Sequence, residues 1–277
     1  IGLWLENVSL TTEADAKNLL YKKRQVLLFG IAVSLGILGV LKYFNFFGQT
    51  LFEIFNLFQI DVVFTPVKFM VPIGISFYTL QMISYIMDVY RGNQKAEHNL
   101  MKIALYLSFF PTIMEGPICR YHQVGEDLYA GKGIEFKNLK FGYQRIVWGL
   151  FKKMVIADRL YATVSHVFDN YNDLDGSIIA LGVVCYTVQL YMEFSGCMDI
   201  IIGSGEIFGV TLPENFRQPF AAKDASEFWR RWHITLGTFF KDYIFYSISL
   251  AKPVKKFAKR VKEKCGRTGG IWWTWQM

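Results

Sequence analysis

Long apolar stretches alternate with short polar ones along this chain, and their lengths predict helices that enter a membrane. Residues 26–44 are apolar apart from Lys42 and follow a basic cluster at residues 22–24, while residues 69–87 carry no charge over 19 residues. A helix needs about 20 apolar residues to cross the hydrocarbon core. Both stretches are therefore predicted to span, with Pro72 and Gly74 bending the second one near its start.

The remaining apolar runs are shorter or carry charges. Residues 103–114 end at Glu115, Gly116 and Pro117, and this run is too short for a simple span, so we expect a re-entrant or half-buried segment that forms a tunnel wall. Three runs contain or adjoin charged residues: 146–157 with Lys152 and Lys153, 176–192, and 196–212 with Asp199 and Glu206, the last two parted by Glu193. Because a charge at membrane depth costs roughly 2.5–3.5 kcal/mol, these should face water, protein or a tunnel.

Two polar segments suggest an orientation. The acidic residues Asp169, Asp173 and Asp175 indicate either a loop on the non-cytoplasmic side or a plain solvated turn. Residues 252–264 hold seven basic residues and one acidic residue. Their apolar positions recur at helical spacing, which predicts an amphipathic helix on the cytoplasmic leaflet; a simple basic linker is the alternative.

A histidine lies in the stretch EFWRRWHITLGTFF, residues 227–240. Asp224 followed by Glu227 resembles a capping box and predicts a helix start. On one continuous helix Trp229, His233, Leu236 and Phe240 would share a face. The uncharged part covers only about 14 Å, which is too short to span. We therefore expect a short helix that lines an internal funnel, the alternative being a core histidine bonded to a backbone carbonyl.

Composition strengthens the membrane interpretation. Of 277 residues, 52% are hydrophobic and only 19% charged, with a mean hydropathy of +0.24. The apolar runs do not alternate with period 2, which disfavours a membrane barrel. We predict an all-α polytopic membrane protein with one transmembrane domain over residues 1–277, incomplete at both ends because the chain opens without Met. Residues 1–5 lack the features of a cleavable signal peptide.

Charge and cysteine usage exclude other classes. The net charge is +7, but the basic residues flank apolar stretches, as the positive-inside rule describes, so nucleic acid is not an expected partner. Cysteines 119, 185, 197 and 265 lack the spacing of a disulfide framework or a zinc site and are interpreted as packing residues. The three remaining histidines lie apart, and no metal site is predicted: His98, His122 and His166.

Several sequence blocks together point to a family. They are YTVQLYMEFSGCMDIIIGSGEIFGVTLPENFRQPF (186–220), FWRRWHITLGTFFKDYIF (228–245), SFYTLQMISYIMDVYRG (76–92), FFPTIMEGPICRY (109–121) and GLFKKMVIADRL (149–160). In their order along the chain, these blocks resemble the AlgI-like branch of the membrane-bound O-acyltransferase (MBOAT) family, over most of the chain. The resemblance implies a helical ring around a funnel or tunnel with short re-entrant helices, located in the bacterial cytoplasmic membrane.

The resemblance also implies site residues. His233 corresponds to the histidine of the family's WHITL-type block and is the predicted catalytic residue. The family carries a second histidine in a GxWHG-type block, usually regarded as the catalytic one. Gly270, Ile271 and Trp272 match the start of that block, but Trp273 stands where its histidine would be. We expect His233 to orient or polarise a substrate, while the second histidine would be the main base.

The implied reaction transfers an acyl group, preferably acetyl, from a cytoplasmic thioester to hydroxyls of a cell-envelope or extracellular polysaccharide. Acetyl-CoA or an acyl carrier phosphopantetheine would be the donor and not a bound cofactor, and a separate extracytoplasmic acyltransferase is a possible partner besides membrane lipid. The predicted substrate-binding residues are Trp229, Arg230, Arg231, Trp232, Glu193 and Asp199. The arginines suit phosphate binding or a positive-inside anchor equally, and the two carboxylates could bind an acceptor hydroxyl or pack helices.

Other functions stay open at this level. D-alanyl transfer toward teichoic acid is an alternative within the family, and a catalytically inactive scaffold or truncated form is another. A transporter or channel would also contain charges and broken helices in the membrane. The absence of an inverted repeat and the order of the blocks favour the acyltransferase.

Overall fold

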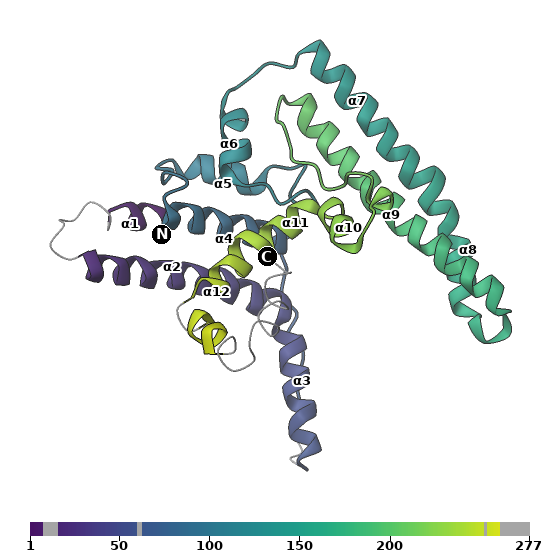
Figure 1. The fold of residues 1–277 in the computed structure, drawn as a ribbon, viewed down its shortest axis with the longest axis horizontal. Coiled ribbons are helices and arrows are strands. Elements are labelled where there is room, and N and C mark those ends of the chain that lie inside the picture. The colour runs from purple at the N-terminus through teal and green to yellow at the C-terminus, as the bar shows by residue number, and fades with distance from the viewer. Residues whose placement is uncertain (8–15, 60–62, 252–253, 261–277) are drawn as a thin grey trace. The chain divides into compact units, whose positions relative to one another are not determined.

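The computed structural model describes residues 1–7, 16–59, 63–251 and 254–260. The ordered elements within these ranges are helices, and no strand occurs among them, which confirms the all-α class. The chain divides into two compact units, residues 1–217 and 218–277, and each is described by itself. The single transmembrane domain and the ring around a funnel stay predictions. The helices are labelled in Figure 1.

The first unit opens with a long apolar helical segment. Helix α1 covers Gly2–Asn7, α2 covers Ala16–Leu38, the π-helix η2 covers Gly39–Tyr43, and α3 covers Phe44–Leu57. Residues 18–57 form a candidate membrane span that contains the predicted span 26–44. Tyr43, at the end of η2, has a non-helical backbone (φ −113°, ψ 1°), and the chain changes direction there (Figure 1).

The predicted span at residues 69–87 is wrong in its first part. Residues 69–74 are not helical, and α4 covers Ile75–Arg91, or 17 residues. Gly74 begins this helix at φ +76°, a conformation that side chains rarely adopt, and a Cβ there would collide with the carbonyl of Ile113. Pro72 supplies no N–H for a helical hydrogen bond. The apolar composition of residues 69–87 does not show where Pro72 and Gly74 prevent a helix.

The short run at residues 103–114 does not form a span. Helix α5 covers Leu100–Ser108, and the chain then turns until α6, which covers Tyr121–Tyr129. Thr112 and Phe109 are buried in this turn. The expectation of a segment too short to cross is confirmed, while its re-entrant path stays a prediction.

A long helical hairpin completes the first unit. Helix α7 covers Phe136–Leu150, η3 covers Phe151–Ala157, α8 covers Asp158–Asp169, η4 covers Tyr171–Asp173 and α9 covers Gly176–Ile207. Helix α9 joins the two apolar runs that Glu193 separates in the sequence, and its 32 residues give a length of about 48 Å. The other members of the hairpin lie along α9 (Figure 1).

Glycines bring α7 and α9 into backbone contact. A Cβ at Gly142 would lie 2.5 Å from the carbonyl oxygen of Gly203, and a Cβ at Gly149 would lie 2.5 Å from that of Gly196. The two glycines of each helix are seven residues apart, so they lie on one face. The pairing of 142 with 203 and of 149 with 196 makes the helices antiparallel. Small residues that let backbones approach are typical of helix packing in membranes.

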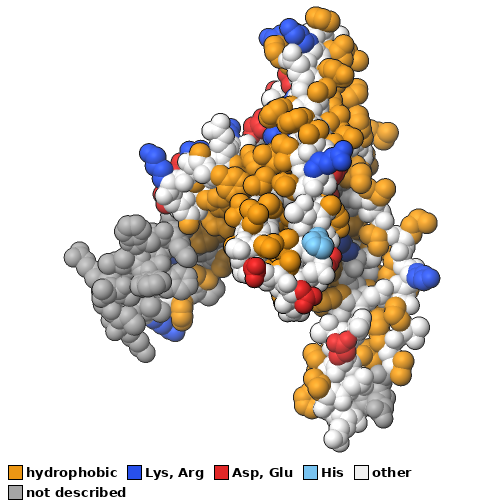
Figure 2. Space-filling view, turned by 90° about the vertical axis from the view of Figure 1, so that its right-hand side faces the viewer, with side chains coloured by type: hydrophobic (Ala, Val, Ile, Leu, Met, Phe, Trp, Pro, Cys, Tyr) orange, Lys and Arg blue, Asp and Glu red, His pale blue; other side chains and the backbone are white. Residues whose placement is uncertain are grey.

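Most of the surface of the two candidate spans is apolar and exposed. The most apolar 18-residue windows of residues 18–57 and Gly176–Ile207 have mean hydropathies of 2.1 and 1.5, yet only 17% and 11% of these windows are buried. A core helix of a soluble protein would be mostly buried. Figure 2 shows apolar side chains spread widely over one face. A chain that contacts lipid explains this exposure.

The second unit consists of short helices. It contains η5 (Pro219–Ala221), α10 (Ala225–Arg231), α11 (Ile234–Phe239), η6 (Phe240–Phe245) and α12 (Tyr246–Ser249), followed by helical residues 254–260. Residues 254–260 of the predicted basic interfacial helix are helical, and Lys255, Lys256, Lys259 and Arg260 are exposed there; its place on the membrane surface stays a prediction. Residues 252–253 and 261–264 of that prediction lie outside the described residues.

Candidate functional site

The histidine stretch starts where the sequence predicts. The Asp224 carboxylate caps α10 by accepting the N–H of Glu227 at 2.7 Å. The Glu227 carboxylate in turn accepts the N–H of Lys223 at 2.8 Å. Side chains thereby satisfy N–H groups that a helix start leaves unpaired. These two hydrogen bonds fix the backbone at the start of α10.

The continuous helix predicted through His233 is wrong. Helix α10 ends at Arg231 and α11 begins at Ile234. Trp232 between them is extended (φ −102°, ψ 126°), and His233 adopts the left-handed conformation (φ 46°, ψ 52°). The break changes the direction in which side chains point, so the shared face expected for residues 229, 233, 236 and 240 does not exist.

His233 occupies a strained backbone position. A left-handed residue other than glycine costs roughly 1–2 kcal/mol, and such positions cluster at active sites and ligand clamps. The His233 carbonyl accepts the N–H of Gly237 at 3.0 Å, which ties the residue to the first turn of α11. The imidazole is half-buried, and this burial lowers its pKa below the usual 6.5. The side chain is therefore neutral at pH 7, the form that accepts a proton.

Aromatic side chains precede the histidine. The ring of Trp232 stacks on Phe228 with centroids 5.6 Å apart and an interplanar angle of 18°, and Phe220 lies 6.2 Å from Phe228. Trp229 is 65% exposed and meets only the edge of this cluster, with its ring 5.3 Å from Phe228. Trp232 is thus a packing residue within its unit, whereas Trp229 presents a free face.

The two arginines of the stretch differ in their contacts. The Arg231 guanidinium donates to the Glu227 carboxylate at 2.6 Å, as an i, i+4 ion pair, and to the carbonyl of Gln218 at 3.4 Å. The exposed Arg230 donates to the hydroxyl of Ser226 at 2.9 Å. Neutralisation by Glu227 makes Arg231 the weaker candidate for an anionic ligand. Arg230 keeps its net charge on the surface.

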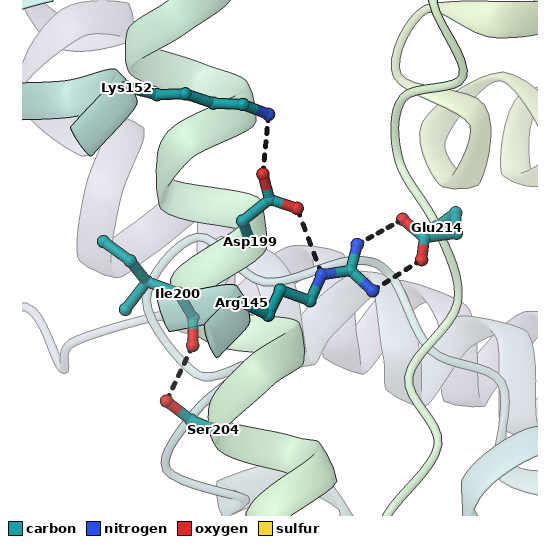
Figure 3. A network of polar contacts seen from close by, with 6 residues as sticks. All are labelled: Arg145, Lys152, Asp199, Ile200, Ser204 and Glu214. Carbon is teal, nitrogen blue, oxygen red and sulfur yellow. Dashed lines mark hydrogen bonds and ion pairs between the residues drawn. The ribbon is translucent and has the colours of Figure 1, made fainter. Parts of the chain in front are cut away.

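The predicted carboxylate Asp199 lies in an ion-pair network of the first unit, drawn in Figure 3. Its two oxygens accept from Arg145 Nε at 3.1 Å and from Lys152 Nζ at 2.6 Å. The other guanidinium nitrogens of Arg145 bind both oxygens of Glu214 at 2.7 and 2.6 Å. The network joins α7, η3 and α9 to the segment that follows α9. Asp199 and Lys152 side chains are each only 14% exposed, so water screens their attraction little.

Glu193, the other predicted carboxylate, pairs with Lys153 Nζ at 3.3 Å across the α9 and η3 contact. Both carboxylates therefore hold helices together, as the packing alternative expects. Lys152 and Lys153, which lie within an apolar run, thus each form an ion pair with a carboxylate of α9. An additional role of Glu193 or Asp199 in binding an acceptor stays a prediction.

Sequence reasoning overlooked Arg145 and Glu214. Arg145 is seven residues before Lys152, so the two cations lie on one side of their helix, and an acidic partner on α9 could have been sought from that spacing. Glu214 follows α9 in a non-helical segment and has no periodicity from which its partner could be deduced.

The remaining candidate ligands are isolated or buried. No group of three His, Cys, Asp or Glu residues is placed to hold a metal ion among the residues that the structure describes. Burial raises the pKa of the Cys119 thiol to about 12, so this cysteine is an unreactive packing residue. His98 and His122 are 76% and 43% exposed and lie beside Glu6 and Asp88, respectively. Residues 265 and 270–273, which include the second family block, lie outside the described part of the chain.

Comparison with known proteins identifies the family to which the chain belongs. The model of the membrane-bound O-acyltransferase family matches residues 94–261, more than half of the chain. A probable alginate O-acetylase of Pseudomonas aeruginosa is 40% identical over 80% of this chain and 42% of its own length. A peptidoglycan O-acetyltransferase of Helicobacter pylori is 31% identical over 90% of this chain and 51% of its own length.

A third relative has a different named activity. The teichoic acid D-alanyltransferase of Bacillus subtilis is 31% identical over 68% of this chain and 48% of its own length. The chain thus spans about half the length of the curated relatives that it matches.

Proposed function

The chain belongs to the membrane-bound O-acyltransferase family, and from this premise we propose that it is the part of a membrane O-acyltransferase that carries the first family histidine. The enzyme would move an acyl group, with acetyl as the first candidate, from a cytoplasmic thioester to hydroxyls of a cell-envelope or extracellular polysaccharide. The names of the most similar relatives support acetyl transfer to a polysaccharide.

His233 is the observation that carries this proposal. In the transfer, the hydroxyl oxygen attacks the thioester carbonyl, the new C–O bond forms as the C–S bond breaks, and the hydroxyl proton finally reaches the thiolate that leaves. A neutral imidazole accepts a hydrogen bond from the hydroxyl and so orients and polarises it. The left-handed backbone and the capped α10 fix the imidazole direction before substrate arrives. The main base would be the histidine of the second family block.

The donor side of the proposal uses the exposed residues of α10. Arg230 and Trp229 present a cation and an aromatic face on successive positions. A coenzyme A or a phosphopantetheine arm carries phosphate, which an arginine fork binds well. The basic helical residues 254–260 would bind the anionic cytoplasmic leaflet of a bacterial membrane, or an acidic carrier protein.

Two alternatives follow from specific observations. D-alanyl transfer toward teichoic acid is supported by the relative of that name, whose identity of 31% over 68% of the chain is below that of the alginate O-acetylase. A scaffold without activity of its own is supported by Trp273, which stands where the second histidine of the family would be.

Transfer of radiolabel from acetyl-CoA to polysaccharide, in membranes that contain the full-length protein of which this chain is the proposed part, tests the proposal. His233→Ala should lower the transfer rate about 10²–10⁴-fold, the range typical of a positioned proton acceptor. His166→Ala, which changes an exposed histidine of α8, is the matched control and should leave the rate unchanged. Full transfer by the His233 variant would refute the role of His233, and no transfer by the wild-type protein would favour the scaffold.

A further inference from the structure

A second group of aromatic and polar side chains surrounds a pocket in the first unit. The pocket has a volume of about 450 Å³, within the range of roughly 300–1,000 Å³ of small-molecule sites. It lies between α5, α6 and the segment that follows α4. We call it the tyrosine pocket and define it by six lining residues: Gln94, Glu97, Lys102, Tyr121, Glu126 and Tyr129.

The floor of the tyrosine pocket is rigid. Tyr121 lies between Tyr85 and Tyr106, with ring centroids 5.2 Å from each. Its hydroxyl donates to the Glu97 carboxylate at 2.8 Å, and the Tyr85 hydroxyl accepts the N–H of Glu97 at 2.8 Å. The Tyr106 hydroxyl donates to the carbonyl of Cys119 at 2.7 Å. These bonds fix the carboxylate and the ring, so that a ligand would find them already oriented.

Helix α6 presents two tyrosines to the same side. Tyr121, Gly125 and Tyr129 are spaced four residues apart and lie on one face. Because the residue between them is glycine, no side chain separates the two rings along the helix. The ring centroids of Tyr121 and Tyr129 are 6.2 Å apart, and the Tyr129 hydroxyl donates to the carbonyl of Lys102 at 2.7 Å. Tyr121 is buried and forms the floor, so the half-buried Tyr129 is the ring that a ligand can reach.

The charges of the pocket disfavour two ligand classes. The Glu97 and Glu126 carboxylates repel anions such as phosphate esters, and they oppose the attraction of Lys102, which lines the same pocket together with His122. An organic cation would bind a tyrosine face, but Lys102 Nζ already lies 4.9 Å from the centroid of Tyr129 and 3.9 Å from the Glu97 carboxylate. The pocket therefore supplies its own cation. Its remaining capacity is for hydrogen bonding and for apolar contact with a ring.

We propose that the tyrosine pocket binds a neutral, hydroxyl-rich ligand of one or two sugar rings. Sugar hydroxyls would donate to Glu97 and accept from Gln94 and Lys102, while the C–H face of a pyranose would cover the Tyr129 ring. This class includes the saccharide acceptor of the proposed function. Binding needs no acyl donor, however, so failure of this proposal and failure of the transfer reaction are measured separately.

Saturation-transfer NMR on the full chain in detergent tests the ligand class, with cellotetraose as the neutral saccharide and with glycerol phosphate and choline as the charged probes. We expect saturable binding of cellotetraose at millimolar concentration and none of the other two. Absence of cellotetraose binding, or equal binding of either charged probe, would overturn the proposal.

Variants then assign the binding to the pocket. Tyr129→Leu removes the ring face and should weaken cellotetraose binding about tenfold, whereas Tyr129→Phe keeps the ring and should stay within about twofold. Tyr143→Leu changes a tyrosine of α7 that is 62% exposed and lies outside the pocket lining, so it should have no effect.

A second variant guards against misfolding. Gln94→Ala changes a half-buried loop side chain whose loss the fold tolerates, and it should weaken binding about threefold. Unchanged binding in both Tyr129→Leu and Gln94→Ala would place the saccharide elsewhere and refute the site.

Discussion

At the scale of single residues, the proposed chemistry would use a neutral histidine in a left-handed backbone conformation. Burial lowers the pKa of His233 below 6.5, so the folded chain binds a proton less tightly than the unfolded chain does. Protonation therefore favours unfolding. Above about pH 7.5, one unit over the ordinary pKa, the imidazole is neutral in both states, and His233 causes no pH dependence. As the pH falls below that value, the free energy of unfolding should fall until the lowered pKa is passed.

This sign can be checked by thermal unfolding in detergent between pH 5 and pH 7.5. His233→Asn should lose stability less steeply with falling pH than the wild type, because asparagine tolerates the left-handed conformation but does not titrate. His166→Asn makes the same replacement at an exposed histidine of α8 and is measured alongside as the matched variant. Equal slopes for the wild type and His233→Asn would show that the imidazole is not protected from protonation.

The sequence predicts local features of the site better than contacts between residues that are far apart in the chain. Asp224 and Glu227 were correctly identified as a helix start because capping depends on local spacing. The left-handed conformation of His233 was not predicted, since the apolar residues around it continue at helical spacing on both sides of the break. The partner of Asp199 in α7 was also not predicted, because a contact between residues 54 positions apart depends on how helices pack.

At the scale of elements, the α7 and α9 contact depends on glycine. Gly149→Ala would place a Cβ 2.5 Å from the carbonyl oxygen of Gly196, so the helices would have to separate. We expect a cost of about 1–3 kcal/mol in the free energy of unfolding, measured by titrating mixed micelles with a denaturing detergent.

Gly36→Ala is the matched control for that variant. Gly36 also lies within a helix, α2, but no atom comes within 4 Å of its added Cβ. Alanine there should raise stability by about 0.5–1 kcal/mol, because glycine loses more backbone freedom on folding. If both variants shifted the unfolding midpoint alike, helix propensity rather than close packing would explain the effect.

The ion pairs of the same hairpin make an asymmetric prediction. Asp199→Asn leaves Lys152 without its carboxylate, whereas Lys152→Met leaves Asp199 still bonded to Arg145. Loss of one member of a buried pair typically costs about 3–5 kcal/mol, and we expect that range for Asp199→Asn and a smaller loss for Lys152→Met. The double variant should be more stable than Asp199→Asn alone, which a double-mutant cycle measures. A double variant no better than Asp199→Asn would contradict the pairing.

The length of an apolar run predicts a helix correctly where no proline or left-handed glycine interrupts the backbone. Residues 26–44 and 176–192 are helical, and so is the run 196–212 up to Ile207, because length and composition dominate there. The prediction failed at residues 69–74, where Pro72 and Gly74 prevent a helix. The seven-residue spacing of glycines in α7 and α9 was present in the sequence, but its meaning depends on the matching spacing in the partner helix.

At the scale of the whole molecule, the composition is sufficient to predict the class of protein, which is a membrane protein. The high apolar content predicted a membrane protein, and the family confirms that the chain belongs to a membrane-bound group. The activity could not have been obtained from composition. The proposed activity was inferred from short blocks in a defined order, of which the WHITL-type block contributes two polar side chains, His233 and Thr235.

The orientation of the chain in the membrane can be tested on the helical hairpin of α7 and α9. Helix α9 is about 48 Å long, which exceeds the roughly 30 Å of the hydrocarbon core, so its two ends should lie on opposite sides. The turn before α9 carries Asp169 and Asp173, while α7 begins with Lys137 and Lys140 beside the other end of α9. By the positive-inside rule, the basic end is cytoplasmic.

Cysteine labelling in bacterial cells that express the chain measures this orientation. Asp173→Cys should react with a membrane-impermeant maleimide in intact cells, whereas Lys137→Cys should react only after permeabilisation. The wild-type protein supplies the background from native cysteines such as Cys185 and Cys197. Labelling of both positions in intact cells would mean that α9 does not cross the bilayer, and the reverse order would mean that the acidic turn is cytoplasmic. Either result would refute the predicted orientation of the hairpin.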